Sequence, residues 1–338
     1  MDNNHEIFQF LKPFQNDQLS SLSGIDIQTF IILLNNYYLE LRQKLHLDRQ
    51  VSFGLEIEFE HVDKEGLEKE LYQNFPRRNW LITDDASLKE GAEINSPIMQ
   101  DKEITWKHLA KVCEITRKFA KIDKDSSGHI HIGTQILGNN LEAWLRFLKI
   151  WSVYENIIFR FANGEYLTTR PRIMEYAAPV RRSFKREYEK SLREEISLIE
   201  LFRNLKYNRY LAVNFRNIDI YHPDVFERFN TLEFRLPNGT LDATIWQNNI
   251  NFFVKLLSYT KSSLFDMDVI LKREKDTFSQ MMDLRLYDEI FLQQALELSD
   301  LIFDNNLDKI YFLKQYLKAY QISKNHDNFV KGPILTKK

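Results

Sequence analysis

The strictest constraint in this 338-residue chain is a segment whose alternate residues differ sharply in chemistry. In residues 52–62, SFGLEIEFEHV, apolar residues alternate with Glu56, Glu58 and Glu60. Alternate side chains of a strand point to opposite faces, so the three carboxylates would share one face. Glutamate is uncommon in strands, and three on one face repel each other unless cations or water intervene. Taken alone, the segment is explained equally well by a half-exposed strand with a solvated acidic face.

Residues 126–135, SSGHIHIGTQ, show the same division with histidines in place of glutamates. His129 and His131 are two residues apart, so on a strand they would share one face while the isoleucines occupy the other. Two imidazoles on one face indicate a site for a metal ion or a phosphate. The flanking glycines fit a short strand that begins and ends in a turn or at a close approach of the backbone.

Two further segments divide in the same way. Residues 231–241, TLEFRLPNGTL, place Glu233 and Arg235 on one face, although a cross-strand salt bridge on the surface also accounts for this pair. Residues 83–97, TDDASLKEGAEINSP, form a polar loop that leads into Glu93, whose two neighbours are apolar. Each segment alone is a weak signal.

If the four segments pair in one sheet, its polar face carries at least four carboxylates, two imidazoles and a guanidinium. One arginine cannot neutralise so many carboxylates, whereas two hard divalent ions could. Oxygen-dominated ligation favours Mg²⁺ or Mn²⁺ over zinc. Two such ions beside an arginine are suited to phosphoryl transfer, although the chain has neither a GxxxxGK[ST] loop nor the protein-kinase motifs.

In order and spelling these motifs resemble those of the putative amidoligases, carboxylate–amine ligases related to glutamine synthetase and glutamate–cysteine ligase. The matching segments are FGLEIEFE, DASLKEGAEINSP, SGHIHIG, RYLAVNF and LEFRLPNGTL, within residues 53–241. The resemblance implies an α+β fold in which a curved antiparallel sheet, a half-barrel of glutamine-synthetase type, is flanked by helices. The concave face of that sheet would be the active site.

The resemblance also implies a set of metal ligands. Glu56 and Glu58 would each face a different metal ion. Glu93 would join Glu58 at the first ion, while His129 and Glu233 would join Glu56 at the second. These five residues are the metal ligands that we expect from the sequence.

Further matching residues would contact the nucleotide and the transferred group. Arg235 would contact the transferred phosphate, and His131 would lie near the nucleotide phosphates. Arg209, in YNRYLAVNF, would be a second contact to a phosphate or a substrate. ATP and Mg²⁺ or Mn²⁺ are therefore the expected cofactors.

The substrate contacts implied by the resemblance are Asp85, Arg170 and Arg172. Asp85 would lie near the first metal or the incoming amine, where a carboxylate could stabilise an ammonium and accept its proton. The two arginines would contact a substrate carboxylate. The implied activity is an ATP-dependent, ADP-forming ligase that joins a carboxylate to an amine through an acyl phosphate, giving a peptide or isopeptide bond. The substrates could be amino acids, peptides or peptidyl side chains.

Two other classes of protein compete with this interpretation. A non-catalytic relative of the same fold could bind a nucleotide or a peptide, but such a relative would more often have lost one of the ligands. A cupin-like metal oxygenase is suggested by the two histidines. That class needs a glutamate three or four residues after the second histidine, and Gln135 stands there instead.

Composition sets the remaining expectations. The 46 basic and 48 acidic residues nearly balance, so there is no general electrostatic reason to bind nucleic acid or a membrane. The single cysteine, Cys113, excludes disulfides within the chain and is expected in a helix core. With no secretory signal and no membrane span expected, the predicted location is cytoplasmic. A homo-oligomer stays open, because related ligases form rings or dimers.

Helical spacing of apolar residues covers much of the rest of the chain. We expect an N-terminal helical segment at residues 1–48, an amidoligase-like core at 49–265, and a helical C-terminal extension at 266–338 packed on that core. The individual helices are predicted at residues 25–45, 103–121, 140–162, 246–265, 288–303 and 307–322.

Overall fold

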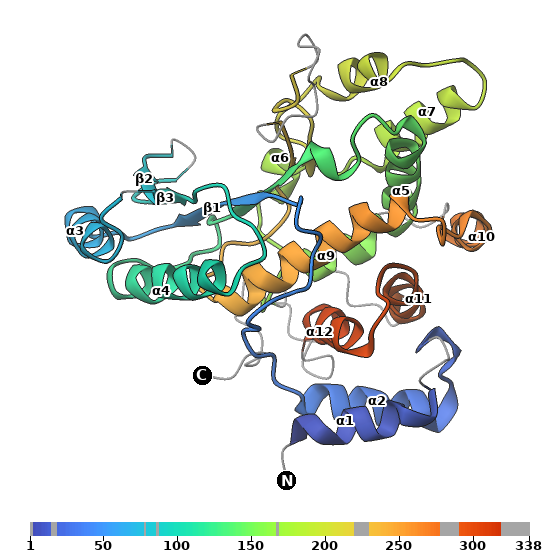
Figure 1. Ribbon diagram of the computed structural model, residues 1–338, viewed down its shortest axis with the longest axis horizontal. Helices are drawn as coiled ribbons and strands as arrows, with labels where there is room; N and C mark the ends of the chain where they lie inside the picture. The colour runs from blue at the N-terminus through green and yellow to red at the C-terminus, as the bar shows by residue number, and fades with distance from the viewer. Residues whose placement is uncertain are drawn as a thin grey trace.

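The computed structural model describes residues 3–14, 19–77, 79–85, 88–166, 169–219, 230–277 and 291–318. Within these residues the fold is α+β, as expected, with a six-stranded antiparallel sheet in the order β2-β3-β1-β4-β6-β5 (Figure 1). The strands are β1 (Phe53–Phe59), β2 (Leu81–Thr83), β3 (Ala92–Asn95), β4 (Gly128–Gly133), β5 (Val213–Asn214) and β6 (Thr231–Phe234).

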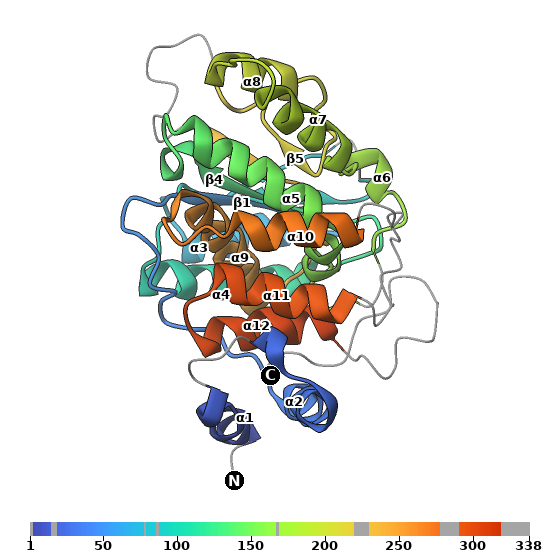
Figure 2. The same cartoon turned by 90° about the vertical axis from the view of Figure 1, so that its right-hand side faces the viewer.

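Helices precede, interrupt and follow the strands along the chain. The longer ones are α1 (Asn3–Leu11), α2 (Gly24–Asn36), α3 (Lys64–Asn74), α4 (Glu103–Phe119), α5 (Leu141–Ala162), α7 (Arg181–Ser191), α8 (Leu198–Leu205), α9 (Ala243–Lys261), α10 (Met267–Thr277), α11 (Leu292–Ile302) and α12 (Asn306–Leu317). The short ones are η1 (Lys12–Phe14), η2 (Leu19–Ser21), η3 (Thr134–Ile136) and α6 (Ile173–Tyr176). Figure 2 shows α10, α11 and α12 beside α5, against which all three pack; α11 and α12 also pack against α9.

The apolar face of the sheet packs on helices α4, α5 and α9. Phe53 of β1 stacks on Trp106 of α4 with ring centroids 5.4 Å apart. Phe234 of β6 stacks on Phe253 of α9 at 4.2 Å and on Trp151 of α5 at 5.8 Å. Burying aromatic side chains of this size contributes about 1.5–3 kcal/mol each, so this face holds the sheet in place.

The register of the strands decides which residues meet on the opposite, polar face. The Cα partners there are Glu56 with His129, Glu58 with Glu93, Gly54 with His131, and His131 with Glu233. The polar residues of β1, β3, β4 and β6 therefore form adjacent rows, as the alternation in the sequence predicts. The sheet places in one area ionisable groups that are up to 177 residues apart in the chain, the interval from Glu56 to Glu233.

The helix predicted for residues 25–45 is partly wrong. Helix α2 ends at Asn36, and the rest of the predicted helix, Tyr37 to Leu45, is not helical. Its backbone amides bond to distant side chains instead: those of Leu45 and Leu47 donate to Asp101 at 2.9 and 3.1 Å. These tertiary acceptors replace the i→i−4 hydrogen bonds that the apolar spacing favours.

The other predicted helices are confirmed within the described residues. They correspond to α4, α5, α9, α11 and α12, and Cys113 is buried in α4 as expected. Residues 288–290 and 319–322, at the ends of the last two predicted helices, lie outside the described residues. The division into three segments stays a prediction.

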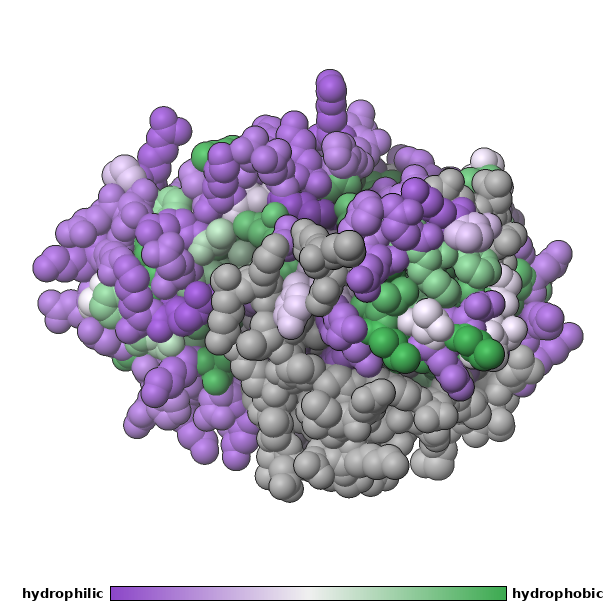
Figure 3. All heavy atoms as spheres, turned by 90° about the horizontal axis from the view of Figure 1, so that it is seen from below, coloured by the Kyte–Doolittle hydropathy of each residue, from purple (hydrophilic) through white to green (hydrophobic). Residues whose placement is uncertain are grey.

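The face of the molecule seen from below (Figure 3) is largely hydrophilic where the structure describes it. Figure 3 shows one face, on which hydrophobic side chains gather only in limited areas among hydrophilic ones. Ile25 and Leu264 are the most exposed large hydrophobic residues in the described part of the chain, at 80% and 81%. No helix among the described residues is both long and apolar enough to cross a membrane.

Two strand glycines give a matched test of the packing below the sheet. A Cβ at Gly128 would overlap the indole of buried Trp246, whereas at Gly54 the nearest atom, Ser96 Oγ, would be 3.6 Å away. We expect Gly128→Ala to lower the free energy of unfolding by about 1–3 kcal/mol and Gly54→Ala to change it by less than about 0.5 kcal/mol. Denaturant titration measures both, and equal effects would contradict this packing.

Candidate active site

A cavity of about 560 Å³ opens on the polar face of the sheet. Besides the strands, it is lined by α6 and by the connection from α8 into and beyond β5. The residues predicted from the sequence that line it are Glu56, Asp85, Glu93, His129, Arg209, Glu233 and Arg235. Such a cavity, polar and built from several strands, is large enough for a small-molecule substrate.

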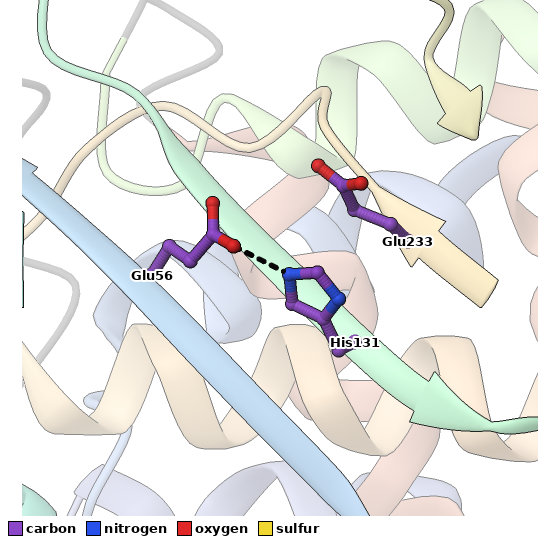
Figure 4. A group of neighbouring side chains, drawn as sticks. All are labelled: Glu56, His131 and Glu233. Atoms are coloured by element: carbon purple, nitrogen blue, oxygen red, sulfur yellow. Dashed lines mark hydrogen bonds and ion pairs between the residues drawn. The ribbon is translucent and has the colours of Figure 1, made fainter. Parts of the chain in front are cut away.

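Glu56, His131 and Glu233 form one candidate metal group, drawn in Figure 4. One ligand atom from each lies within 4.8 Å of the other two. Glu56 Oε1 accepts a hydrogen bond from His131 Nε2 at 2.9 Å, and Oε2 accepts one from His129 Nδ1. Burial favours a higher pKa for Glu56, but the hydrogen bonds and charges of the two histidines outweigh it and lower the pKa. Glu56 is therefore held as a carboxylate.

Glu233 is buried and its carboxylate is fixed from three directions. Asn214 Nδ2 donates to Oε2 at 2.6 Å, Asn217 Nδ2 donates to the same oxygen at 3.2 Å, and Arg235 Nη1 pairs with Oε1. Arg235 in turn donates from Nε to the backbone oxygen of Tyr176 at 3.3 Å. The carboxylate and the guanidinium are thus positioned together at the cavity wall.

Glu58, Asp85 and Glu93 form a second candidate group, again with ligand atoms within 4.8 Å of one another. Glu58 is buried and accepts from the backbone amide of Ser127 at 2.8 Å. Burial raises the pKa of Glu93, and hydrogen bonds from Asn95 and Thr83 oppose this only in part. The nearby charges of Glu56 and Asp85 raise that pKa further.

The donor atoms of both groups suit hard divalent ions. The second group offers carboxylate oxygens alone, and the first adds one imidazole to two carboxylates. Mg²⁺ prefers oxygen ligands and Mn²⁺ also accepts a histidine, whereas zinc sites carry more nitrogen or sulfur. A dication would also relieve the repulsion that raises the pKa of Glu93. The residues present therefore fit Mg²⁺ or Mn²⁺.

The histidine in the metal group around Glu56 differs from the one that the sequence predicts. The metal group around Glu56 includes His131, whereas His129 is buried among Glu56, Glu58 and Glu233 with its Nδ1 bonded to Glu56. Both histidines face the same group, so the sequence order does not decide which one would bind the ion. Glu60 joins neither group.

The three carboxylates predicted on one face, Glu56 and Glu58 in β1 and Glu60 just after it, have two different environments. Glu60 is buried and accepts from the backbone amides of Lys89 and Glu90 at 3.2 and 3.0 Å. It fixes the segment before β3 instead of facing the cavity. Arg170 and Arg172 line a smaller cavity together with Glu58, and Arg209 stacks on the ring of Tyr210 at 4.7 Å.

Sequence reasoning missed several lining residues. Asn214 and Asn217 hold Glu233, Arg216 adds a cation to the wall, and Tyr176 separates the main cavity from the smaller one by lining both. Asn214 lies inside the quoted segment RYLAVNF, one residue after an apolar one, so strand alternation could have identified it. The others follow the strand or belong to connections, where no periodicity marks a face.

Comparison with known proteins identifies the family. The sequence model of the family described as "Putative amidoligase enzyme" matches residues 79–257, more than half of the chain. The protein therefore belongs to this family, which confirms the resemblance noted in its motifs. Curated proteins give no significant match. Among solved structures, one described as "Crystal structure of novel glutamine synthase homolog" aligns with a TM-score of 0.46 and 12% identity, over 82% of this chain and 68% of that chain.

The two groups predict that a divalent ion stabilises the folded protein. We expect Mn²⁺ or Mg²⁺ to raise the melting temperature, because an ion at about 100 times its dissociation constant adds about 2.7 kcal/mol. Glu93→Gln keeps the acceptor oxygen for Thr83 and Asn95 but removes a charge, so it should reduce this increase without lowering the ion-free melting temperature.

The matched control is Glu90→Gln, three residues away, whose side chain is 79% exposed. Its melting temperature should equal that of the wild type, both with and without the ion. EDTA should abolish the ion-dependent increase in melting temperature in the wild type and in Glu90→Gln. An ion effect that is equal in Glu93→Gln and wild type would remove Glu93 from the binding groups.

Proposed function

We propose that the protein is an ATP-dependent, ADP-forming carboxylate–amine ligase. The observation that carries this proposal is the pair of candidate metal groups that lie beside Arg235 on one face of the sheet. Membership of the amidoligase family implies the use of ATP and of carboxylate and amine substrates. We also propose that the sheet corresponds to the glutamine-synthetase-type half-barrel, with residues 1–48 and 266–338 as helical extensions of a core at 49–265.

The chain's own residues would hold two divalent ions. Glu58 and Glu93, with Asp85 beside them, would hold the first, while Glu56 and Glu233 would hold the second together with His129 or His131. Such ions would neutralise the charge of nucleotide phosphates, which would lower the barrier to phosphoryl transfer. Asn214 would keep Glu233 in position through its 2.6 Å hydrogen bond.

Arg235 would meet the negative charge that develops on the transferred phosphoryl group. Its pairing with Glu233 and its hydrogen bond to Tyr176 hold the guanidinium in one orientation before reaction, which is the condition for effective electrostatic stabilisation. Arg209 is exposed and stacked on Tyr210, so it could move toward a phosphate or a substrate. His131 would also lie near the nucleotide phosphates.

The reaction would proceed in two steps. An oxygen of the substrate carboxylate attacks the γ-phosphorus of ATP, the bond to the β-phosphate oxygen breaks, and an acyl phosphate and ADP form. The amine nitrogen then attacks the acyl carbon, phosphate leaves, and the amide forms. Asp85 would stabilise the incoming ammonium and accept its proton, and Arg170 and Arg172 would contact the carboxylate substrate. A nucleotide seated over the site would keep water from the acyl phosphate.

The first test needs no knowledge of the substrates. Calorimetric titration of Mg·ATP should show binding to the wild type that EDTA abolishes. Glu56→Gln/Glu58→Gln should lose it, because each carboxylate belongs to a different ion-binding group. The control Glu103→Gln/Glu114→Gln removes two exposed charges from α4 and should bind normally. Failure of the folded wild type to bind Mg·ATP would contradict the proposal.

The second test separates a ligase from a relative that only binds nucleotide. Pools of carboxylic acids and amines should release ADP only when an acid and an amine are both present. Arg235→Lys keeps the charge but loses the planar fork, so it should lower kcat by about 10²–10³ while Mg·ATP still binds. A protein that binds Mg·ATP but releases ADP with no pool would be a nucleotide-binding protein and not a ligase. An unchanged kcat in Arg235→Lys would show that Arg235 does not stabilise the transferred phosphoryl group.

A further inference from the structure

Residues 176–180, which lead from α6 into α7, lie beside the connection that enters β5. Ala178 and Leu211 form a parallel bridge there. The amide of Ala178 donates to the backbone oxygen of Tyr210, and the amide of Ala212 donates to the backbone oxygen of Ala178, both at 2.8 Å. Segment 176–180 is therefore fixed to the edge of the sheet by backbone hydrogen bonds.

The guanidinium of Arg235 is held against this segment. Its Nε donates to the backbone oxygen of Tyr176 at 3.3 Å, and its Nη1 pairs with Glu233. The backbone amide of Arg235 donates at 2.9 Å to the backbone oxygen of Ala212, which belongs to the same bridge. The direction of the guanidinium therefore depends on where segment 176–180 places the carbonyl group of Tyr176, because a hydrogen bond weakens steeply as its angle closes.

The far end of segment 176–180 is held by Glu155, a carboxylate that the proposed mechanism does not use. Glu155 lies in α5 and is 0% exposed, so it is out of reach of a substrate. Its Oε1 accepts hydrogen bonds from the amides of Val180 and Arg181 at 2.7 and 3.1 Å, and from the indole of Trp151 at 3.0 Å. The two amides begin α7, so the carboxylate also meets the positive end of that helix.

The burial of Glu155 makes this contact a strong restraint. Burial raises the pKa of Glu155, and the charge of Arg181 and the hydrogen bonds lower it only in part. A carboxyl group away from water is costly unless it keeps its hydrogen-bond donors. A shift of segment 176–180 would carry the amides of Val180 and Arg181 away from Glu155, so the segment is held firmly at this end.

Two tyrosine rings restrain the other end of the segment. Tyr176 and Tyr210 pack edge to face, with ring centroids 5.7 Å apart and an interplanar angle of 81°. This geometry is favoured for aromatic pairs, and sliding of segment 176–180 along the connection into β5 would disrupt it. The segment is thus restrained at Tyr176 and at Val180, with the bridge at Ala178 between them.

We propose that Glu155 is a positioning residue for Arg235 and acts through segment 176–180. The proposal rests on the ligase function and deepens it, since Arg235 is the group that would meet the transferred phosphoryl. Glu155 holds the segment, the segment holds the carbonyl group of Tyr176, and that carbonyl group holds the guanidinium in the orientation that the reaction needs. Helix α5 thereby takes part in the reaction although none of its residues lines the main cavity.

Hydrogen exchange of the Arg235 Nε–H tests this proposal without any substrate. In protein labelled with ¹⁵N-arginine, the signal is assigned by its loss in Arg235→Lys. We expect Glu155→Ala to accelerate the exchange by about 10-fold, because the hydrogen bond to Tyr176 opens more often, and Glu155→Gln to accelerate it less, because it keeps one acceptor oxygen. Glu155→Gln is nearly isosteric and decides alone if Glu155→Ala does not fold. Exchange as slow as in the wild type would overturn the proposal.

The matched control is Glu187→Gln. Glu187 is also buried, at 4% exposed, and lies in α7, but its partners Arg186 and Asn204 lie outside segment 176–180. This variant should leave the exchange of the Arg235 Nε–H unchanged. An equal acceleration in Glu187→Gln would mean that general loosening of α7 is sufficient, and it would overturn the specific role of Glu155.

Turnover, measured on the same variants, separates this inference from the ligase proposal. The folded Glu155 variants should lower kcat by up to about 10-fold while KM for ATP stays that of the wild type, because the aim of Arg235 matters most in the transition state. An unchanged kcat would overturn the role of Glu155 in the reaction. If exchange does not respond but the wild type turns over, the inference is wrong and the ligase proposal stands. If exchange responds but no pool of acids and amines releases ADP, the positioning of Arg235 is supported and the ligase proposal fails.

Discussion

The site depends on the antiparallel register that brings ionisable side chains together on one face of the sheet. Glu58 lies opposite Glu93, and His131 lies opposite Glu233. A slip of one residue would turn every carboxylate toward the core and every apolar residue toward the cavity, at a cost of several buried charges. The aromatic packing of Phe53 and Phe234 on the helices below prevents such a slip.

Within that register the polar face has two different halves. The half near β3 carries carboxylates with few cations nearby, and there burial and neighbouring charge raise the pKa of Glu93. The half near β6 is compensated by the histidines and by Arg235. Arg170 and Lys124 line the smaller cavity together with the carboxylates of Glu58 and Asp125.

Strand alternation made much of the site predictable. Glu56, Glu58, Glu93 and Glu233 could be assigned to one face because the period of two residues is a local property of the chain. Prediction from local spacing failed at the end of residues 25–45, where the apolar spacing favours a helix. There Asp101, far along the chain, accepts hydrogen bonds from the backbone amides of Leu45 and Leu47. Apolar periodicity cannot reveal such an acceptor.

The sequence by itself determined the sheet's two faces, the order of the motifs and the family, because these depend on residue type and short-range spacing. Only the tertiary structure decided which histidine shares a group with Glu56 and Glu233, and that Glu60 holds backbone amides and not the cavity. It also decided that Lys124, Arg170 and Glu58 line one small cavity. Those outcomes depend on how separate connections fold over the sheet. Hydrogen bonds between residues that are distant in the chain produce no periodic pattern in the sequence, so the sequence cannot predict them.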